Sequence, residues 1–146
     1  MIVLDTNVVS EALKPGRDPA VIAWLDQQSA ETLYLTATSL AELLIGIAVM
    51  PDAKRKSTIS SALDTLISRL FDTRILPFDH DAAMAYSQLL STARAHGKAV
   101  SMPDGQIGAI ASVHNFSVAT RDVAPFQALG VPVIDPCTAP RVFGTP

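Results

Sequence analysis

Short apolar runs alternate with longer helical patterns along the whole chain, and this alternation is what most restricts the fold. The candidate strands cover residues 2–4, 33–35, 74–78, 116–120 and 131–134. Strands that alternate with helices form parallel sheets with helices on both faces. We therefore expect a three-layer α/β/α fold around a short central parallel sheet of four to five strands. Pro132 places the last strand at an edge, since proline cannot donate to a central ladder.

The length and composition fit one soluble domain. The chain has 146 residues, of which 49% are hydrophobic, enough material for a core. We expect the domain to cover residues 1–135, with residues 136–146, which hold three prolines, as an extended or disordered tail. The single cysteine, Cys137, excludes an intrachain disulfide and a zinc cluster. No signal peptide is seen and the longest apolar tract, 43–50, is too short to cross a bilayer, so we expect a cytoplasmic protein.

Four acidic residues stand at comparable places in this pattern. Asp5 follows the first strand and Asp122 follows the fourth, while Glu42 and Asp104 lie in the opening turns of two helices. In a parallel sheet the carboxyl ends of the strands meet at one edge, and the helices that follow them begin there. The sequence therefore predicts that all four carboxylates lie on the same side of the molecule.

Carboxylates gathered in this way repel one another, so they must take up protons or share a cation. Ligation by oxygen alone favours Mg²⁺ or Mn²⁺ over zinc. Such a site activates water and stabilises the charge that develops on a phosphodiester. We hypothesise that the four acids are the metal ligands and the catalytic residues. The side chains expected to orient them are Thr6, Asn7 and Thr120.

The two acids that follow strands also have simpler interpretations. Asp5 could cap the helix that comes next, since aspartate is favoured at that position. Asp122 could be a loop residue paired with its neighbour Arg121. The sequence alone leaves these alternatives open.

The two acids within helices have alternatives as well. Glu42 is the only charged residue in the helix predicted over 38–50, which is apolar on nearly all sides and is therefore expected to be buried. Glu42 could instead point to solvent at a thin polar edge. Asp104 lies three residues after Ser101, as in a capping box, but it shares the apolar stripe of Ile107 and Ala111. No Lys or Arg on the Glu42 helix could pair with it, which favours a bound cation.

The overall charge permits a nucleic-acid partner without requiring one. The net charge is −3, but setting the four acids aside leaves 11 basic against 10 acidic residues. The basic run 54–56 is interpreted as a solvated face, with contact to a substrate backbone as the alternative. The chain has neither a P-loop nor a Gly-x-Gly-x-x-Gly motif, and its three histidines are scattered, which argues against nucleotide-dependent enzymes and a catalytic triad.

Four ordered motifs resemble those of a known family. They are Leu-Asp-Thr-Asn at 4–7, Ala-Glu-Leu at 41–43 with Gly46, Asp104 followed by the small and apolar residues 107–111, and Ala-Thr-Arg-Asp at 119–122. Together they are similar to the motifs of PIN-domain ribonucleases, and more closely to the VapC toxins of type II toxin–antitoxin pairs, in particular the FitB-like branch. The resemblance covers roughly residues 1–135.

The resemblance implies a metal-dependent ribonuclease that inhibits translation or growth. It also implies a homodimer, a cognate antitoxin that presses an arginine or similar group into the acidic pocket, and a larger toxin–antitoxin assembly on operator DNA. Asp5 and Asp104 match the firmest metal-binding acids of the family, and Glu42 and Asp122 match the other two. Many relatives have an aspartate where this chain has Pro125, so a fifth acid is absent.

Two other functions remain open at this stage. A PIN domain could act in other RNA or DNA processing without an antitoxin. A catalytically silent module could use its acidic pocket only to receive an arginine of a partner.

Overall fold

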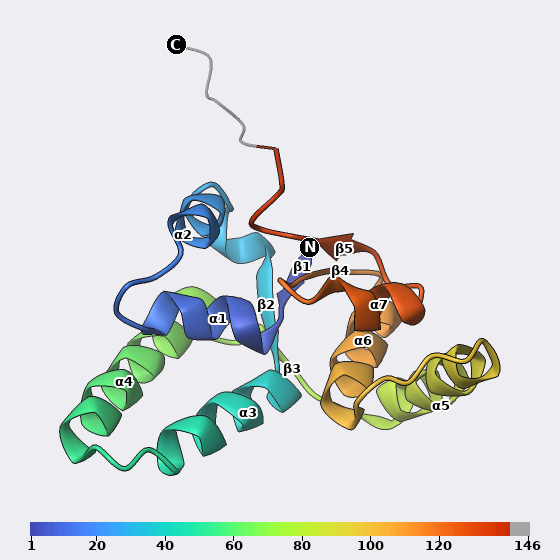
Figure 1. The fold of residues 1–146 in the computed structure, drawn as a ribbon, viewed down its shortest axis with the longest axis horizontal. Helices are drawn as coiled ribbons and strands as arrows, with labels where there is room; N and C mark the ends of the chain where they lie inside the picture. The colour runs from blue at the N-terminus through green and yellow to red at the C-terminus, as the bar shows by residue number, and fades with distance from the viewer. Residues whose placement is uncertain (141–146) are drawn as a thin grey trace.

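One parallel sheet of five strands organises the computed structural model, which describes residues 1–140 (Figure 1). The strand order is β3-β2-β1-β4-β5, so β1 lies at the centre, flanked by β2 and β4. The expected parallel sheet is confirmed, and the strand that holds Val133 and Ile134 lies at an edge as predicted. The strands are β1 (Ile2–Leu4), β2 (Leu33–Thr36), β3 (Ile75–Leu76), β4 (Ser117–Ala119) and β5 (Val133–Ile134).

Seven α-helices connect these strands within the described residues. Two short irregular turns accompany them, a 3-10 turn at Ala30–Thr32 and a π-helical turn at Ile67–Phe71. The π-helical turn closes with a hydrogen bond from Asp72 N to Ile67 O of 2.7 Å. The helices are α1 (Thr6–Leu13), α2 (Pro19–Asp26), α3 (Ala37–Ala48), α4 (Ala53–Leu66), α5 (His80–Ala95), α6 (Met102–His114) and α7 (Val123–Ala128).

The sheet divides the core into two layers. Successive side chains of a strand point to opposite faces, so Leu4 packs into one hydrophobic cluster and Val3 into the other. The Leu4 cluster takes its side chains from α1 to α4, and the Val3 cluster from α5 to α7. The two groups of helices lie on opposite sides of the sheet in Figure 1. The predicted three-layer α/β/α fold is therefore confirmed. Trp24, on α2, is 7% exposed and belongs to the first cluster.

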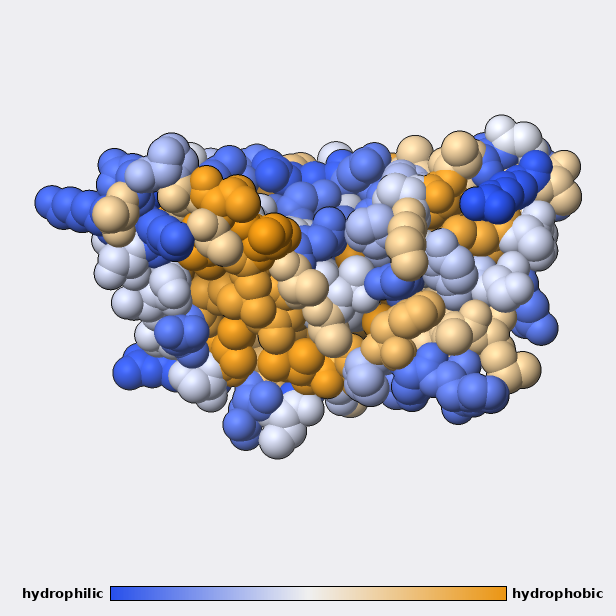
Figure 2. Space-filling view, turned by 90° about the horizontal axis from the view of Figure 1, so that it is seen from below, coloured by the Kyte–Doolittle hydropathy of each residue, from blue (hydrophilic) through white to orange (hydrophobic). Residues whose placement is uncertain are grey.

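The prediction that the helix over 38–50 is buried was wrong. Only a narrow stripe of α3 faces the core, formed by Ser39, Leu43 and Ile47. On its other side, Ile45 is 60% exposed and Val49 is 70% exposed. Figure 2 shows hydrophobic residues gathered in one large area of the surface seen from below, where α3 lies. A helix that is apolar on every side is buried only if other elements cover each side. No element within residues 1–140 covers the side of α3 that carries Ile45 and Val49.

Small residues let α6 pack closely against its neighbours. A Cβ atom added at Gly105 would lie 2.8 Å from side-chain atoms of both Leu90 and Tyr86 on α5. Ser101 caps the start of α6, and Asn115 ends it in the left-handed conformation with φ of 57°. This packing fixes the opening turn of α6, which carries Asp104.

The end of the chain is described only in part. Thr138 N and Ala139 N both donate to Asp135 O, so a turn covers residues 136–139, where the predicted extended or disordered tail begins. The rest of the predicted tail, residues 141–146, lies outside the described residues. Among residues 1–140, none of the helices combines the length and the apolarity needed to span a bilayer.

Candidate functional site

Three helices begin close together at the carboxyl ends of the central strands. Figure 1 shows the first turns of α1, α3 and α6 near one another beneath the sheet. A hydrogen bond of 2.9 Å from Thr38 Oγ1 to Gln106 Oε1 joins the start of α3 to the start of α6. Each of these helices carries or directly follows one of the predicted acids, namely Asp5, Glu42 and Asp104.

Asp5 is the buried centre of this arrangement. Its side chain is 5% exposed and lies between β1 and α1. Oδ1 accepts a hydrogen bond of 2.7 Å from Thr6 N, and Oδ2 accepts one of 2.8 Å from Thr120 Oγ1. Asp5 is therefore the N-cap of α1, as the simpler interpretation of the sequence predicted. The cap and a role as a ligand are compatible, since each carboxylate oxygen keeps a further lone pair.

The surroundings of Asp5 make its ionised form costly. The pKa of Asp5 is raised from 3.8 to about 6, chiefly because the side chain is buried and in smaller part because of the charges of Asp104 and Glu42. The hydrogen bonds from Thr120 and Thr6 oppose the shift without cancelling it. Acids from three separate elements thus act on one another through space, as expected of carboxylates at one edge of the sheet.

Glu42 is joined to Asp5 through one residue. Its Oε1 accepts a hydrogen bond of 2.7 Å from Thr6 Oγ1, while the backbone N–H of Thr6 donates to Asp5. Thr6 thereby holds the two carboxylates beside each other. The side chain of Glu42 is half-buried and lines an apolar groove, so it does not simply point to solvent.

Asp104 and Asp122, the other two predicted acids, are more exposed to solvent than Asp5. Asp104 is half-buried, and its N–H donates to Ser101 Oγ over 3.3 Å, which confirms the predicted cap. Burial, and after it the charge of Asp122, raises the pKa of Asp104, while the hydrogen bond with Ser101 lowers it. Asp122 is exposed and lies between β4 and α7.

The three supporting residues predicted from the sequence form one hydrogen-bonded network. Thr120 is fully buried and donates to Asp5 Oδ2. Its hydroxyl accepts from Asn7 Nδ2 at 3.2 Å and from Asp122 N at 3.0 Å. Asn7 Oδ1 in turn accepts from Arg121 N at 3.2 Å. The network fixes the loop after β4 against Asp5 and α1.

Glu11 is a residue of this region that the sequence analysis missed. It is 2% exposed, and its Oε2 lies 2.8 Å from Lys14 Nζ and 3.0 Å from Arg121 Nη2. The hydrogen bond with Lys14 lowers the pKa of Glu11, and the charge of Arg121 acts in the same direction. Arg121 thus pairs with Glu11 rather than with Asp122. The spacing of Glu11 and Lys14 could have suggested their pairing, but nothing local points to Arg121.

The four acids lie in one region, but their carboxylates do not surround a common position for a metal ion. Among residues 1–140, no three His, Cys, Asp or Glu side chains come close enough together to hold a metal ion as they stand. The expected convergence on one cation is therefore not seen. The carboxylates of Asp5 and Glu42 accept hydrogen bonds from neighbouring residues instead.

The chemistry of the donor set nevertheless suits a divalent cation. All four side chains offer carboxylate oxygens, and none of them forms a salt bridge with any residue that the structure describes. The charges of Asp104 and Glu42 add to the rise that burial causes in the pKa of Asp5, so these carboxylates repel that of Asp5. A cation that neutralised them would relieve that repulsion.

Comparison with known proteins finds relatives that match nearly the whole chain in sequence and in fold. A family model described as PIN domain matches residues 2–131. VapC ribonuclease Y4jK of Sinorhizobium fredii is 47% identical over 136 residues, which are 93% of this chain and 97% of the relative. Toxin FitB of Neisseria gonorrhoeae is 45% identical over 136 residues, 93% of this chain and 98% of the relative. The crystal structure of FitAcB from Neisseria gonorrhoeae has a TM-score of 0.91 at 44% identity and covers 95% of this chain and 100% of its own.

Proposed function

The chain belongs to the PIN-domain family, and from that premise we propose that it is the toxin of a type II toxin–antitoxin pair, an endoribonuclease that hydrolyses RNA phosphodiester bonds. The observation that carries this proposal is the buried carboxylate of Asp5, whose pKa is raised to about 6 beside Glu42 and Asp104. Relatives that match nearly the whole chain are named a ribonuclease and a toxin, which supports the same activity.

The proposed site assigns a role to each residue. Asp5, Glu42, Asp104 and Asp122 would hold Mg²⁺ or Mn²⁺. A cation bound there would supply a hydroxide nucleophile at neutral pH and neutralise the charge that develops on the phosphate. Thr6 and Thr120 would orient Asp5 and Glu42 through the hydrogen bonds described above, and Asn7 would hold Thr120 in place.

The proposal includes protein partners. A toxic ribonuclease must be held inactive by a cognate antitoxin, and an arginine of that antitoxin would be attracted to acids that have no cationic partner among residues 1–140. The exposed apolar surface of α3 supports a homodimer or a protein partner. An assembly of the pair on operator DNA and a cytoplasmic location stay predictions.

One observation favours a second candidate. The carboxylates do not enclose a point that three of them could share within the described part of the chain. A catalytically silent module, whose acids only receive a partner's arginine, would need no such point. A PIN nuclease that acts without an antitoxin would differ from the proposal only in its partner.

Cleavage of RNA tests these candidates. The full chain should cleave single-stranded RNA with Mg²⁺ or Mn²⁺ and should stop doing so in EDTA. Asp5→Asn and Asp104→Asn should each abolish cleavage, whereas Glu31→Gln, an exposed acid far from the site in sequence, should not. Cleavage that survives both aspartate changes would rule out the proposed site, and a wild-type chain that never cleaves RNA would favour the silent module.

A further inference from the structure

A groove runs between α1 and α4 and opens beside the acidic site. It consists of two adjoining cavities of about 780 Å³ and about 250 Å³. Both cavities are lined by Leu13 and Lys14 at the end of α1 and by Arg55 and Ile59 on α4. Because they share these four residues, the cavities form one continuous groove.

The inner end of the groove reaches the acidic site. The smaller cavity is lined by Thr6 and Glu42, the pair joined by the hydrogen bond of 2.7 Å. The larger cavity extends to Arg17 and Lys54 on the far side of the shared residues. A strand that lay along the whole groove would therefore pass from Glu42 to Arg17.

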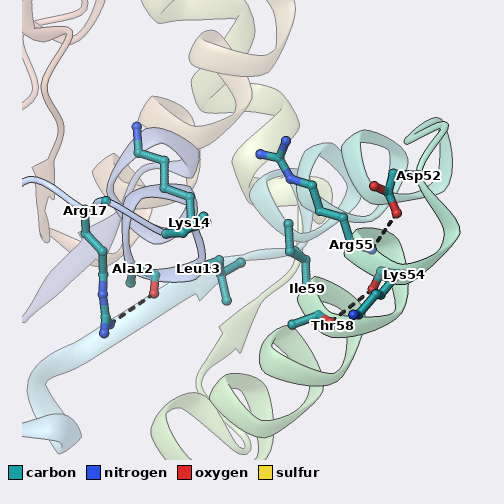
Figure 3. A pocket seen from close by; sticks show the side chains of 11 residues that line it. Ala12, Leu13, Lys14, Arg17, Asp52, Lys54, Arg55, Thr58 and Ile59 are labelled. Atoms are coloured by element: carbon teal, nitrogen blue, oxygen red, sulfur yellow. Dashed lines mark hydrogen bonds between the residues drawn. The ribbon is translucent and has the colours of Figure 1, made fainter.

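The outer part of the groove is strongly basic. Four cationic side chains line the larger cavity, and Asp52 is its only acid. Asp52 Oδ1 accepts from Arg55 N, so it serves as the N-cap of α4. Lys54 and Arg55 have no carboxylate within salt-bridge distance in the described part of the chain. Figure 3 shows the side chains of Lys14 and Arg55 extending to the same side of the groove, one from each helix.

The position of these cations is unfavourable for the helix that carries them. Lys54 and Arg55 lie in the first turn of α4, which contains no acid. The first turn of a helix favours negative charge, since the helix dipole is positive there. Lys56, the third cation of this run, turns away and donates to Ala48 O at 3.0 Å. An anion lying across the groove would offset the cost of placing Lys54 and Arg55 there.

We propose that this groove binds the sugar–phosphate backbone of the RNA strand next to the bond that is cleaved. The proposal rests on the function proposed above. Arg55 contacts the phosphate nearer to Glu42, beside Lys14, whose Nζ also lies 2.8 Å from Glu11 Oε2, and Arg17 and Lys54 contact the next phosphate outward. Leu13 and Ile59 lie between Arg17 and Lys54 in Figure 3 and line the groove with apolar side chains. Such a lining suits the face of a ribose or a base. RNA is favoured over an acidic protein segment because its backbone carries a negative charge at every nucleotide, which matches a groove that is lined by Arg17, Lys54 and Arg55 and reaches Glu42 at its inner end.

Binding of RNA by the full chain tests the proposal. The probe is a fluorescein-labelled single-stranded RNA of mixed sequence, followed by anisotropy in EDTA over a series of salt concentrations. The double variant Lys54→Gln with Arg55→Gln should reduce the slope of log K against log salt by about 1.4, about 0.7 for each lost phosphate contact. With Mg²⁺ present, the same variant should raise KM about fivefold or more and change kcat much less.

A matched control removes the same charge elsewhere. Arg94 and Lys98 are exposed at the end of α5, on the other side of the sheet from α4 (Figure 1). Arg94→Gln with Lys98→Gln should leave the slope and KM close to those of the wild type. Thermal unfolding of both double variants should match the wild type, since all four side chains lie on the surface.

The possible results separate this inference from the proposed function. A wild-type chain that cleaves RNA while the two double variants bind RNA alike would overturn the groove and leave the nuclease standing. If the Lys54 and Arg55 variant binds RNA as the wild type does but no longer binds a purified antitoxin, the groove binds a protein and the proposal is overturned. A wild-type chain that neither binds nor cleaves RNA would overturn both.

Discussion

At the scale of single residues, Thr6 and Thr120 decide how the central carboxylates are held. Thr6 donates to Asp5 through its backbone and to Glu42 through its hydroxyl. Thr120 donates to Asp5 while it accepts from Asn7 and from Asp122 N. The site therefore depends on two hydroxyl groups as much as on the acids themselves.

The pKa of Asp5 predicts an unusual dependence of stability on pH in metal-free buffer. Its pKa is about 6 in the folded chain against 3.8 for an ordinary aspartate, so the folded state holds the proton more tightly. The free energy of unfolding should fall by up to about 3 kcal/mol as the pH rises from about 4 to about 7. Asp5→Asn should lack this fall and should be more stable than the wild type at pH 7. Urea denaturation in EDTA at both pH values measures the difference, and parallel pH profiles would contradict it.

Replacing Thr120 by valine should weaken both stability and activity. Thr120→Val leaves Asp5, Asn7 and Asp122 N each without one buried partner, which should cost about 1–3 kcal/mol of unfolding free energy. Loss of the oriented carboxylate should lower the rate of RNA cleavage about 10- to 100-fold. Thr92→Val, at an exposed position of α5, is the control and should change neither quantity appreciably. Equal effects of the two substitutions would show that Thr120 has no special role.

At the scale of elements, an ion pair between a buried carboxylate and an exposed arginine joins α1 to the loop between β4 and α7. Glu11 on α1 contacts Arg121 in that loop, next to the exposed Asp122. The contact complements the hydrogen bonds of Thr120, which lies in the same loop and joins it to Asp5 at the end of β1. The two connections together keep Asp122 at the acidic edge of the sheet.

Neutralising Glu11 should loosen this connection. Glu11→Gln keeps an oxygen for Asp18 N but removes the charge that pairs with Lys14 and Arg121, which should cost about 1–3 kcal/mol. The lowered pKa of Glu11 means that its contribution is present above the ordinary value of 4.5 and is lost as the pH falls through the folded pKa. Denaturation curves should therefore separate the variant from the wild type at pH 7 and bring them together in acid. Glu31→Gln is the exposed control, and a cost that did not shrink in acid would contradict the ionic explanation.

Local sequence signals predicted the helices and strands well, but they predicted the contacts between distant residues less well. Both ends of α5 carry local signals, since Asp79 caps its start and Gly97 follows its end with a φ of +73°. The region of the four acids followed from the parallel sheet. The pairing of Glu11 with Arg121 joins residues far apart in the sequence, and the exposed side of α3 depends on what does not cover it. Neither can be read from a local pattern.

At the scale of the whole molecule, the acidic site lies where the two layers of helices meet. Asp5 and Glu42 belong to the side packed by α1 to α4, and Asp104 belongs to α6 on the other side. The groove and the exposed apolar surface of α3 are both on the α1 to α4 side. That side therefore carries the contacts proposed for RNA and for protein partners.

The apolar surface of α3 should hold a second protein chain. Leu44→Gln with Ile45→Gln should reduce self-association or antitoxin binding, because both side chains are more than half exposed in the single chain. The stability of the isolated chain should change by less than about 1 kcal/mol. Sedimentation of the wild type and the variant measures the change in mass. The control is Met84→Gln, which replaces an exposed apolar residue on a different helix, α5. A wild type that stays monomeric and binds its antitoxin as tightly as the variant would contradict the assignment.

Binding of Mn²⁺, followed by calorimetry at pH 7, tests most directly whether the four acids share a cation. The wild-type chain should bind Mn²⁺ at one saturable site or at a coupled pair of sites, and the affinity should be at least about tenfold weaker in Asp5→Asn and in Asp104→Asn. Glu31→Gln should bind Mn²⁺ as the wild type does. A wild-type chain that binds no Mn²⁺, or that binds it as tightly as the two aspartate variants, would contradict the claim that these acids share a cation.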